Sequence, residues 1–325
     1  LMRENSNPMK FRRNNAAAKT LDYSASIAKF FSFGELEIGI DGYFASHDSV
    51  ITNPNNSMFE VVNCNNVQDD RIGIYAQWQQ QYDATQVQLG VRVKHITADA
   101  DDVATSMAMM AMPMPENDMD MGMNNSEMGM NSTEMNDSGM NMDDEMTMPM
   151  PTMAELASDL RDNFNHTDRA ISDTLVDVAL NIEQTISKEL SLNAGLGIKS
   201  RAPSYQERYL WTPMESTGGL ADGNTYIGDI NLAAETAYQV DLGLNYQTKN
   251  FAISPHIFYQ SIDDYIQGTP LGMMDMSEKM MADMMSGDDN PLKFTNGDAK
   301  LSGMDINWHY GYCNWAVSVN LLFGR

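Results

Sequence analysis

Cysteines, basic residues and long apolar runs are all scarce in this 325-residue chain. Its two cysteines, Cys64 and Cys313, are too few for a disulfide scaffold and match no zinc-ligand spacing. Lys and Arg number 20 against 45 Asp and Glu, a net charge of −25, which argues against nucleic-acid binding because phosphates require clustered cations. No run of about 18 apolar residues exists, so no transmembrane helix is expected. A membrane β-barrel stays possible, because only every second residue of its strands faces lipid.

What the chain has instead is alternation of apolar and polar residues with a period of two, which is typical of strands with two different faces. Val87, Leu89, Val91 and Val93 show it, and the segments near 36–40, 176–182, 190–198, 240–246, 251–257 and 315–323 repeat it. Many residues of the opposite face are charged or amides, as expected of a wet lumen. Periodicity alone leaves a helix over 174–186 open.

The connections between these segments are of two kinds. Short links such as 32–34, 82–84, 188–189, 248–250 and 311–314 alternate with long polar stretches over 46–69, 97–166, 201–233 and 263–291. Short turns on one side and long loops on the other are typical of outer-membrane barrels, as are aromatic residues near the short turns. We therefore predict an all-β transmembrane antiparallel barrel of about ten strands. A soluble β-sandwich or propeller also alternates, but seldom keeps its long loops at one end.

Further expectations follow from the same pattern. Thr152 to Glu155 has capping-box spacing, and 277–286 has helical composition ending at Gly287, so two short helices are predicted within loops. Cys64 falls in a long outer loop and Cys313 in a short turn, so the two are not expected to be bonded. No closing strand is apparent, and a barrel cannot leave an edge open to lipid. The sequence is thus expected to be a partial barrel over 1–325.

The one anomaly of composition is 29 methionines, of which 17 lie over 107–153 and 7 over 273–285. A thioether is a soft ligand without a proton to lose, so it suits Cu(I), and Met-x-Met spacing puts two sulfurs on one side of an extended chain. The second cluster pairs methionines four residues apart on a predicted helix. The candidate copper ligands are Met107, Met109, Met110, Met112, Met114, Met119, Met121, Met123, Met128, Met130, Met140, Met142, Met146, Met148, Met150, Met280 and Met284.

The residues around these methionines define an inserted Met-rich acidic loop over 100–165. It carries many Asp and Glu and no Lys or Arg between Lys94 and Arg161. Packing filler is the ordinary role of a methionine, but Pro, Gly, Asn and Asp leave no core to fill in the first cluster. A disordered loop without a metal role remains an alternative there, and packing over the barrel mouth is an alternative for the second cluster.

Catalytic arrangements are not found. The five histidines have no metal-ligand spacing among themselves, and no Ser-His-Asp, Cys-His or phosphate-loop pattern occurs. His256 and His309 have lumen parity in their strands, which favours a pore-lining role. The chain is not expected to be an enzyme or to need a catalytic cofactor.

The stretch from Ser200 through Arg201, Pro203 and Tyr205 to Arg208 resembles one common in TonB-dependent receptor barrels. The segments 228–235, 258–266 and 299–305 also resemble the family, although 228–235 lacks the Lys and Pro usual there. Within the family, copper-type receptors with Met-rich loops are the most similar, through Tyr-Leu-Trp at 209–211 and Thr-Gly-Gly-Leu-Ala-Asp-Gly at 217–223.

That resemblance implies a 22-stranded barrel with a plug, a location in the bacterial outer membrane, and energy from the TonB-ExbB-ExbD complex. It also implies a copper site with Cys and Met on the plug and a His-x-Met on the barrel. An upstream His would complete that motif at Met2. The expected function is therefore capture and import of copper, with copper and membrane lipid as partners. A passive Met-rich copper-resistance barrel and a siderophore receptor with an unusual loop are the alternatives.

Overall fold

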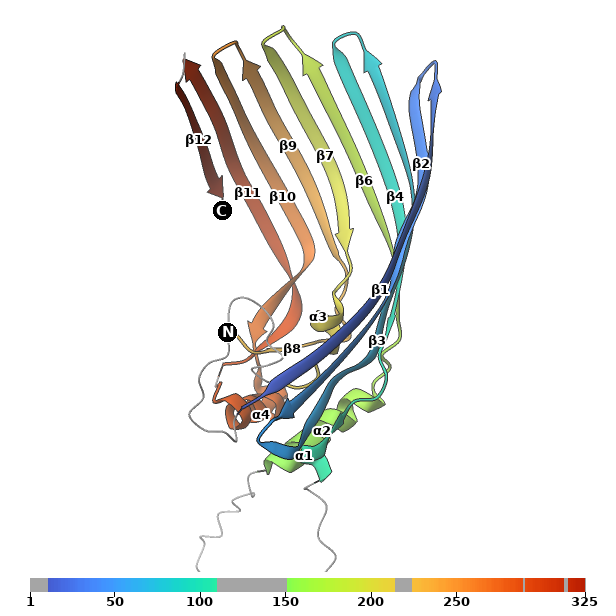
Figure 1. The fold of residues 1–325 in the computed structure, drawn as a ribbon, viewed down its shortest axis with the longest axis vertical. Coiled ribbons are helices and arrows are strands. Elements are labelled where there is room, and N and C mark those ends of the chain that lie inside the picture. The colour runs from blue at the N-terminus through green and yellow to red at the C-terminus, as the bar shows by residue number, and fades with distance from the viewer. Residues whose placement is uncertain (1–10, 110–150, 214–223, 289, 313–314, 325) are drawn as a thin grey trace, which may run out of the picture.

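The protein is represented by a computed structural model that describes residues 11–109, 151–213, 224–288, 290–312 and 315–324. Most of these residues form one curved sheet, shown in Figure 1. Along the sheet the order is β1-β2-β3-β4-β6-β7-β9-β10-β11-β12, and every neighbouring pair on this path is antiparallel. The described part of the chain thus contains ten long strands, as the alternation predicted.

The strands are β1 (Arg13–Phe31), β2 (Gly34–Asn53), β3 (Asn56–Tyr82), β4 (Thr85–Asp99), β5 (Ala104–Thr105), β6 (Ile171–Thr185), β7 (Leu190–Arg201), β8 (Tyr226–Ile227), β9 (Glu235–Gln247), β10 (Phe251–Pro270), β11 (Leu292–Tyr312) and β12 (Trp315–Gly324). The helices are α1 (Ser106–Met109), α2 (Met153–His166), α3 (Tyr205–Tyr209), η2 (Met273–Asp275) and α4 (Met276–Ser286). The two-residue strands β5 and β8 lie off the main path, and β8 makes a parallel pair with β11.

Cross-strand register explains why the outer face is apolar. Ile40 pairs with Ile74, Ile74 with Val93, and Val93 with Val176, so one row of aliphatic side chains crosses four strands. All four side chains are exposed, as are most large apolar residues of the same face. An exposed apolar band over a polar inner face is the pattern of a sheet whose outer surface contacts lipid.

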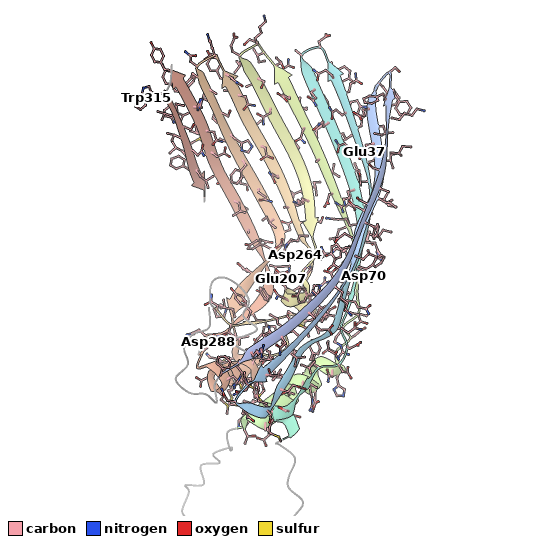
Figure 2. All side chains as sticks on the ribbon, in the orientation of Figure 1. Glu37, Asp70, Glu207, Asp264, Asp288 and Trp315 are labelled. Carbon is pink, nitrogen blue, oxygen red and sulfur yellow. The ribbon has the colours of Figure 1, made fainter. Side chains whose placement is uncertain are left out.

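The two ends of the sheet differ, as the spacing of turns predicted. The short turns lie together at one end, marked in Figure 2 by Trp315, and the long connections with their helices lie at the other, marked by Asp288. Aromatic side chains gather at the short-turn end: Phe31 stacks on Phe33, and the Trp78 indole donates to the Phe33 carbonyl at 2.8 Å. This is the position of an interfacial girdle.

At the opposite end, helices close over an apolar cluster to form a helical cap. α1, α2 and α4 pack beside the outer ends of β2 and β3, with Leu156, Leu160 and Phe164 of α2 in the cluster. Thr152 and Glu155 form the predicted capping box, which satisfies the first amides of α2. α4 ends at Ser286 and is capped by Gly287, whose φ of 68° is the left-handed conformation that glycine tolerates.

Several expectations from the sequence were wrong. The segment 46–69 is not a long loop: β2 and β3 continue through it and turn tightly between Asn53 and Asn56, so Cys64 lies within β3. We predicted a loop because the side chains of this segment are polar. They are polar because the hairpin extends beyond the apolar band. The segment from Asp263 likewise continues β10 to Pro270, through a bulge with Asp264 at a φ of 56°. Residues 174–185 belong to strand β6, so the helical alternative fails.

Cys64 forms no disulfide, which agrees with the prediction that it is not bonded to Cys313; Cys313 itself lies outside the described residues. No helix in the described ranges is both long and apolar enough to cross a membrane.

Candidate functional site

The predicted methionine ligands divide by where the structure describes them. Met107 and Met109 belong to α1, and Met280 and Met284 to α4. Outside the described residues lie Met2, Met110, Met112, Met114, Met119, Met121, Met123, Met128, Met130, Met140, Met142, Met146, Met148 and Met150. The structure therefore places the beginning of the first methionine cluster at α1 and its end at Met153, where α2 starts.

The described ends of the first methionine cluster, at Met107 and Met153, meet the second cluster in the helical cap. Met107 from α1 lies in the same apolar cluster as Met281 and Met285 from α4, and Met153 and Met280 pack against it. The clusters are separated by more than a hundred residues of sequence, so α1, α2 and α4 bring them together at one end of the sheet. Met281 is 0% exposed, which makes it a packing residue of this cap.

Other methionines of the second cluster face solvent. Met273 and Met274 are almost fully exposed, and Met276 and Met284 are exposed to a smaller degree. Solvent-exposed thioethers contribute little to stability, and their sulfur atoms are accessible to a soft metal ion. The helix pairing predicted for Met280 and Met284 thus joins a half-buried side chain to an exposed one.

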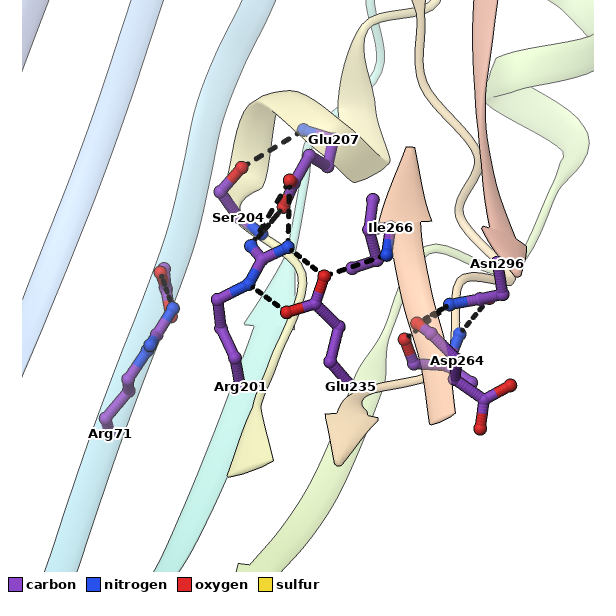
Figure 3. Close-up of polar contacts among 10 residues, drawn as sticks. Arg71, Arg201, Ser204, Glu207, Glu235, Asp264, Ile266 and Asn296 are labelled. Carbon is purple, nitrogen blue, oxygen red and sulfur yellow. Dashed lines mark hydrogen bonds and ion pairs between the residues drawn. The ribbon is translucent and has the colours of Figure 1, made fainter. Parts of the chain in front are cut away.

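Between the cap and the long strands, Arg201 connects three elements at the outer end of the sheet, as shown in Figure 3. Its Nε donates to Glu235 Oε2 at 2.7 Å and its terminal nitrogens donate to Glu235 Oε1 and Glu207 Oε2, both at 2.8 Å. Glu207 is held by the capping box of α3, in which the Ser204 amide donates to its Oε2 at 2.7 Å. The Ile266 amide of β10 donates to Glu235 Oε1 at 2.8 Å.

The charges of this network reinforce each other. Hydrogen bonds to Glu235, followed by those to Glu207, raise the pKa of Arg201 against the opposing effect of burial. Burial disfavours the charged form of Glu235, but the bonds from Arg201 and from the Ile266 amide outweigh it and lower the pKa of that carboxyl. The network therefore fixes the ends of β7, β9 and β10 relative to α3.

The segment after α3 is attached to the sheet by three side chains. Arg208 is buried and pairs with Asp173 of β6 at 2.7 Å. The Tyr209 hydroxyl donates to the Arg169 carbonyl at 2.9 Å, and the Trp211 indole donates to the Val62 carbonyl at 3.2 Å. These contacts hold the chain across the end of the sheet, next to the apolar cluster that contains the methionines.

The inner face of the sheet carries paired charges. Arg92 on β4 reaches Asp41 on β2 at 2.5 Å, across Gly73 of the intervening β3. A Cβ at Gly73 would lie 2.6 Å from the Asp41 carboxylate, so only glycine leaves room for this pair. Lys94 of β4 pairs with Asp177 of the neighbouring β6 at 2.7 Å. The wall is hydrophilic, and these two ion pairs compensate part of its charge.

His256 lies on this inner face, as its parity predicted. Its Nδ1 is 3.2 Å from Asp305 and its Nε2 is 3.5 Å from Asp241. The carboxylates flank the ring on opposite sides, so they orient the imidazole and do not chelate with it. His309 contacts Ser318 through Nδ1 at 2.9 Å.

Within the ranges that the structure describes, no three His, Cys, Asp or Glu side chains are grouped so as to hold a metal ion. The sequence resemblance pointed to Arg201 and Arg208 only as parts of a motif, and it gave neither their partners nor the role of Glu235. Those partners come from elements far apart in the chain. No local signal could have identified them.

Comparison with known families identifies the fold. Residues 4–324 match the model of the TonB-dependent receptor-like β-barrel. The chain belongs to the TonB-dependent receptor family. This is a receptor family and not an enzyme family, and its location is the bacterial outer membrane. The capped end with the long connections is accordingly the extracellular end. Among curated protein sequences, none matches the chain significantly.

Solved structures with the same fold have diverse cargo. The copper transporter OprC matches with a TM-score of 0.60 and 14% identity over 97% of this chain. The FrpB iron transporter of Neisseria meningitidis matches at 0.53 and 12% over 96%. A double mutant of the Serratia marcescens hemophore receptor HasR, in complex with its hemophore HasA and heme, matches at 0.55 and 9% over 96%.

This chain spans 38% of the length of OprC, 36% of FrpB and 42% of HasR. At such identities the likeness concerns the fold alone.

Proposed function

We propose that this chain is the barrel part of a receptor that captures copper at its extracellular cap and imports it. The observation that carries the proposal is that α1, α2 and α4 bring both described ends of the first methionine cluster, Met107 and Met153, to the second cluster in one cap. Of 29 methionines, 24 lie in these two clusters. Thioethers favour Cu(I) over harder ions, and the first cluster contains neither Cys nor His with which to hold zinc.

The acidic residues among the methionines have a complementary role. Carboxylates attract cations of any kind, and the net charge of −25 raises the local cation concentration at an extracellular surface. Selection of the soft ion then depends on sulfur. The copper ligands in this proposal are the sequence-derived methionines, with the exposed Met284 and the half-buried Met280 contributed by α4.

A siderophore receptor is the second candidate, since FrpB and related iron transporters share the fold. Anionic siderophores require free cations and exposed aromatic side chains at the mouth. Three of the described cations at this mouth are held in ion pairs with carboxylates, namely Arg201, Arg208 and Arg169, and Tyr209 and Trp211 are buried. This arrangement favours the copper proposal.

The test uses the full-length receptor in outer membranes. Replacing the methionines of 107–150 with leucine keeps their approximate size and removes sulfur, so Cu(I) binding is expected to fall and Zn(II) binding to stay unchanged. Below about pH 4 Cu(I) binding is expected to persist, because thioethers do not titrate whereas Asp and Glu do. Unchanged Cu(I) affinity in the leucine variant contradicts the proposal.

Import is tested separately from binding. In a copper-limited culture, cells with the receptor are expected to accumulate copper only when the TonB-ExbB-ExbD complex is present. Accumulation without that complex supports a passive copper-resistance barrel. Copper accumulation by the leucine variant equal to the parent would assign import to other residues.

A further inference from the structure

A small hollow lies where β1, β2, β3 and α3 meet, beside the apolar cluster of the cap. Its volume is about 180 Å³. Among its lining residues are His47, Asn63, Cys64 and Tyr205. The lining also includes Asp48 but no Lys or Arg. A hollow with this lining is suited to a cation or a neutral group and not to an anion.

The hollow is produced by irregular strand pairing. Ser49 pairs with Cys64, but the register of β2 and β3 shifts on both sides of this pair. Such bulges let consecutive residues turn toward the same side, and Asn63 and Cys64 are both buried there. The Asn66 amide donates to Asp48 Oδ1 at 2.9 Å, and Asn66 has a φ of 45°. The irregular strand is thus fixed locally.

Small residues on β1 leave the space open. Ala18 pairs with His47, and Ala16 pairs with Ser49. Two larger side chains at these positions would fill the hollow from the β1 side. The third wall comes from α3, where the Tyr205 ring is parallel to the His47 ring with centroids 4.0 Å apart. This stacking holds the imidazole in one orientation.

One buried atom in this hollow lacks a partner. Asn63 is 3% exposed, and its Oδ1 has no hydrogen-bond donor among the described residues. A buried acceptor without a donor carries a desolvation penalty, and such groups mark a site for a ligand. The neighbouring Cys64 is 4% exposed, and burial, with Asp48 nearby, raises the pKa of its thiol to about 12. Without a ligand the thiol is protonated.

We propose that this hollow is a second soft-metal site, in which Cys64 Sγ and a His47 ring nitrogen bind Cu(I) beside the unpartnered Asn63 Oδ1. Binding exchanges the thiol proton for the metal and releases that proton to solvent, without any change of oxidation state. Thiolate and imidazole are ligands that copper accepts readily, and thiolate selects the soft Cu(I) ion. The site uses no methionine, so it is independent of the proposed ligands in the cap.

The structure limits what the site can hold. His47 and Cys64 offer one nitrogen and one sulfur ligand here, and no group of three or more His, Cys, Asp or Glu side chains that could hold a metal occurs in the described ranges. A tetrahedral zinc site needs more nitrogen and sulfur ligands than this. Cu(I) is the ion for which such a sparse sulfur and nitrogen set suffices.

The test compares variants of the full-length receptor titrated with Cu(I) against a chromogenic chelator. Cys64→Ser and His47→Phe are each expected to lose about one equivalent of tightly bound Cu(I). Phenylalanine keeps the stacking on Tyr205 and removes the ring nitrogens. Cys313→Ser and His95→Phe are the matched controls and are expected to bind like the parent. Heat-modifiable electrophoretic mobility verifies that each variant is folded.

Two further measurements separate this site from the methionine loop. In the variant whose methionines of 107–150 are leucine, about one equivalent of Cu(I) is expected to stay tightly bound and to be lost when Cys64→Ser is added. X-ray absorption of that leucine variant is expected to show mixed sulfur and nitrogen ligands. Full Cu(I) stoichiometry in Cys64→Ser, or sulfur-only coordination in the leucine variant, would each overturn the assignment. None of these outcomes would contradict copper capture by the methionine loop.

Discussion

Arg201 and Glu235 form a bidentate ion pair, in which Nε donates to Oε2 at 2.7 Å and a terminal nitrogen donates to Oε1 at 2.8 Å. The pair joins the last residue of β7 to the first residue of β9, across a connection of more than thirty residues. Because Arg201 also binds Glu207 of α3, one guanidinium determines where this extracellular connection leaves and re-enters the sheet.

Arg201→Lys tests the importance of that geometry. A lysine keeps the charge but cannot serve two carboxylates in the fixed plane of a guanidinium. We expect a loss of about 1–2 kcal/mol, since the pair is partly exposed. Amide exchange should increase at Ile266 and around α3, with no change in the hairpins at the short-turn end. Arg13→Lys, on the exposed part of β1, is the control. Equal amide protection in the parent and in R201K would show that the ion pair does not hold these elements in place.

The same pair predicts acid sensitivity of the mouth. The pKa of Glu235 is below its ordinary value of 4.5, so the stability it contributes is present above that value and is lost as pH falls below it. Arg201, whose pKa is raised, stays charged over this range and adds no pH dependence. Protease sensitivity of the 202–234 connection is expected to rise in acid for the parent. In Glu235→Gln it should be high already near neutral pH and change less. A parent profile that is flat below pH 4.5 would contradict this.

The fold was predictable because alternation and turn spacing are local signals. Val87 to Val93 alternate, and β4 follows them; Thr152 and Glu155 predict the start of α2. The hairpin that carries Cys64 was missed, since its outer half leaves the apolar band and loses the alternation by which strands are recognised. The Arg201 partners were missed for a different reason: Glu235 and Ile266 are brought there by strand pairing, which no short sequence window encodes.

The two faces of the sheet should respond differently to charge. Val91→Arg puts a cation on the outward apolar face near the middle of the band, with an expected cost of about 2–4 kcal/mol. Gln77→Arg lies on the polar inner face of the neighbouring strand, where a charge stays hydrated and the change is expected to be within about 0.5 kcal/mol. Urea unfolding in lipid vesicles measures both. Equal costs for the two variants would refute the assignment of faces.

Methionines of α4 should separate into structural and exposed classes. Met281 is 0% exposed and packed in the apolar cluster of the cap, so Met281→Ala leaves a cavity and is expected to cost about 2–5 kcal/mol. Met281→Leu fills nearly the same volume and should cost less than about 1.5 kcal/mol. Met284 is 41% exposed, and Met284→Ala is expected to change stability by about 0.5 kcal/mol or less.

The effects of substituting Met281 and Met284 on Cu(I) affinity should be in the reverse order to their effects on stability. Met281→Leu removes a sulfur that is enclosed by α2 and the sheet, so Cu(I) affinity is expected to be unchanged. Met284→Leu removes a sulfur that can reach an ion from solvent, so affinity is expected to fall. Amide exchange of α2 and α4 gives the stability, and competition with a Cu(I) chelator gives the affinity. If Met281→Leu weakened copper binding while Met284→Leu did not, the cap would have to open during capture, and exposure in the closed cap would not identify the ligands.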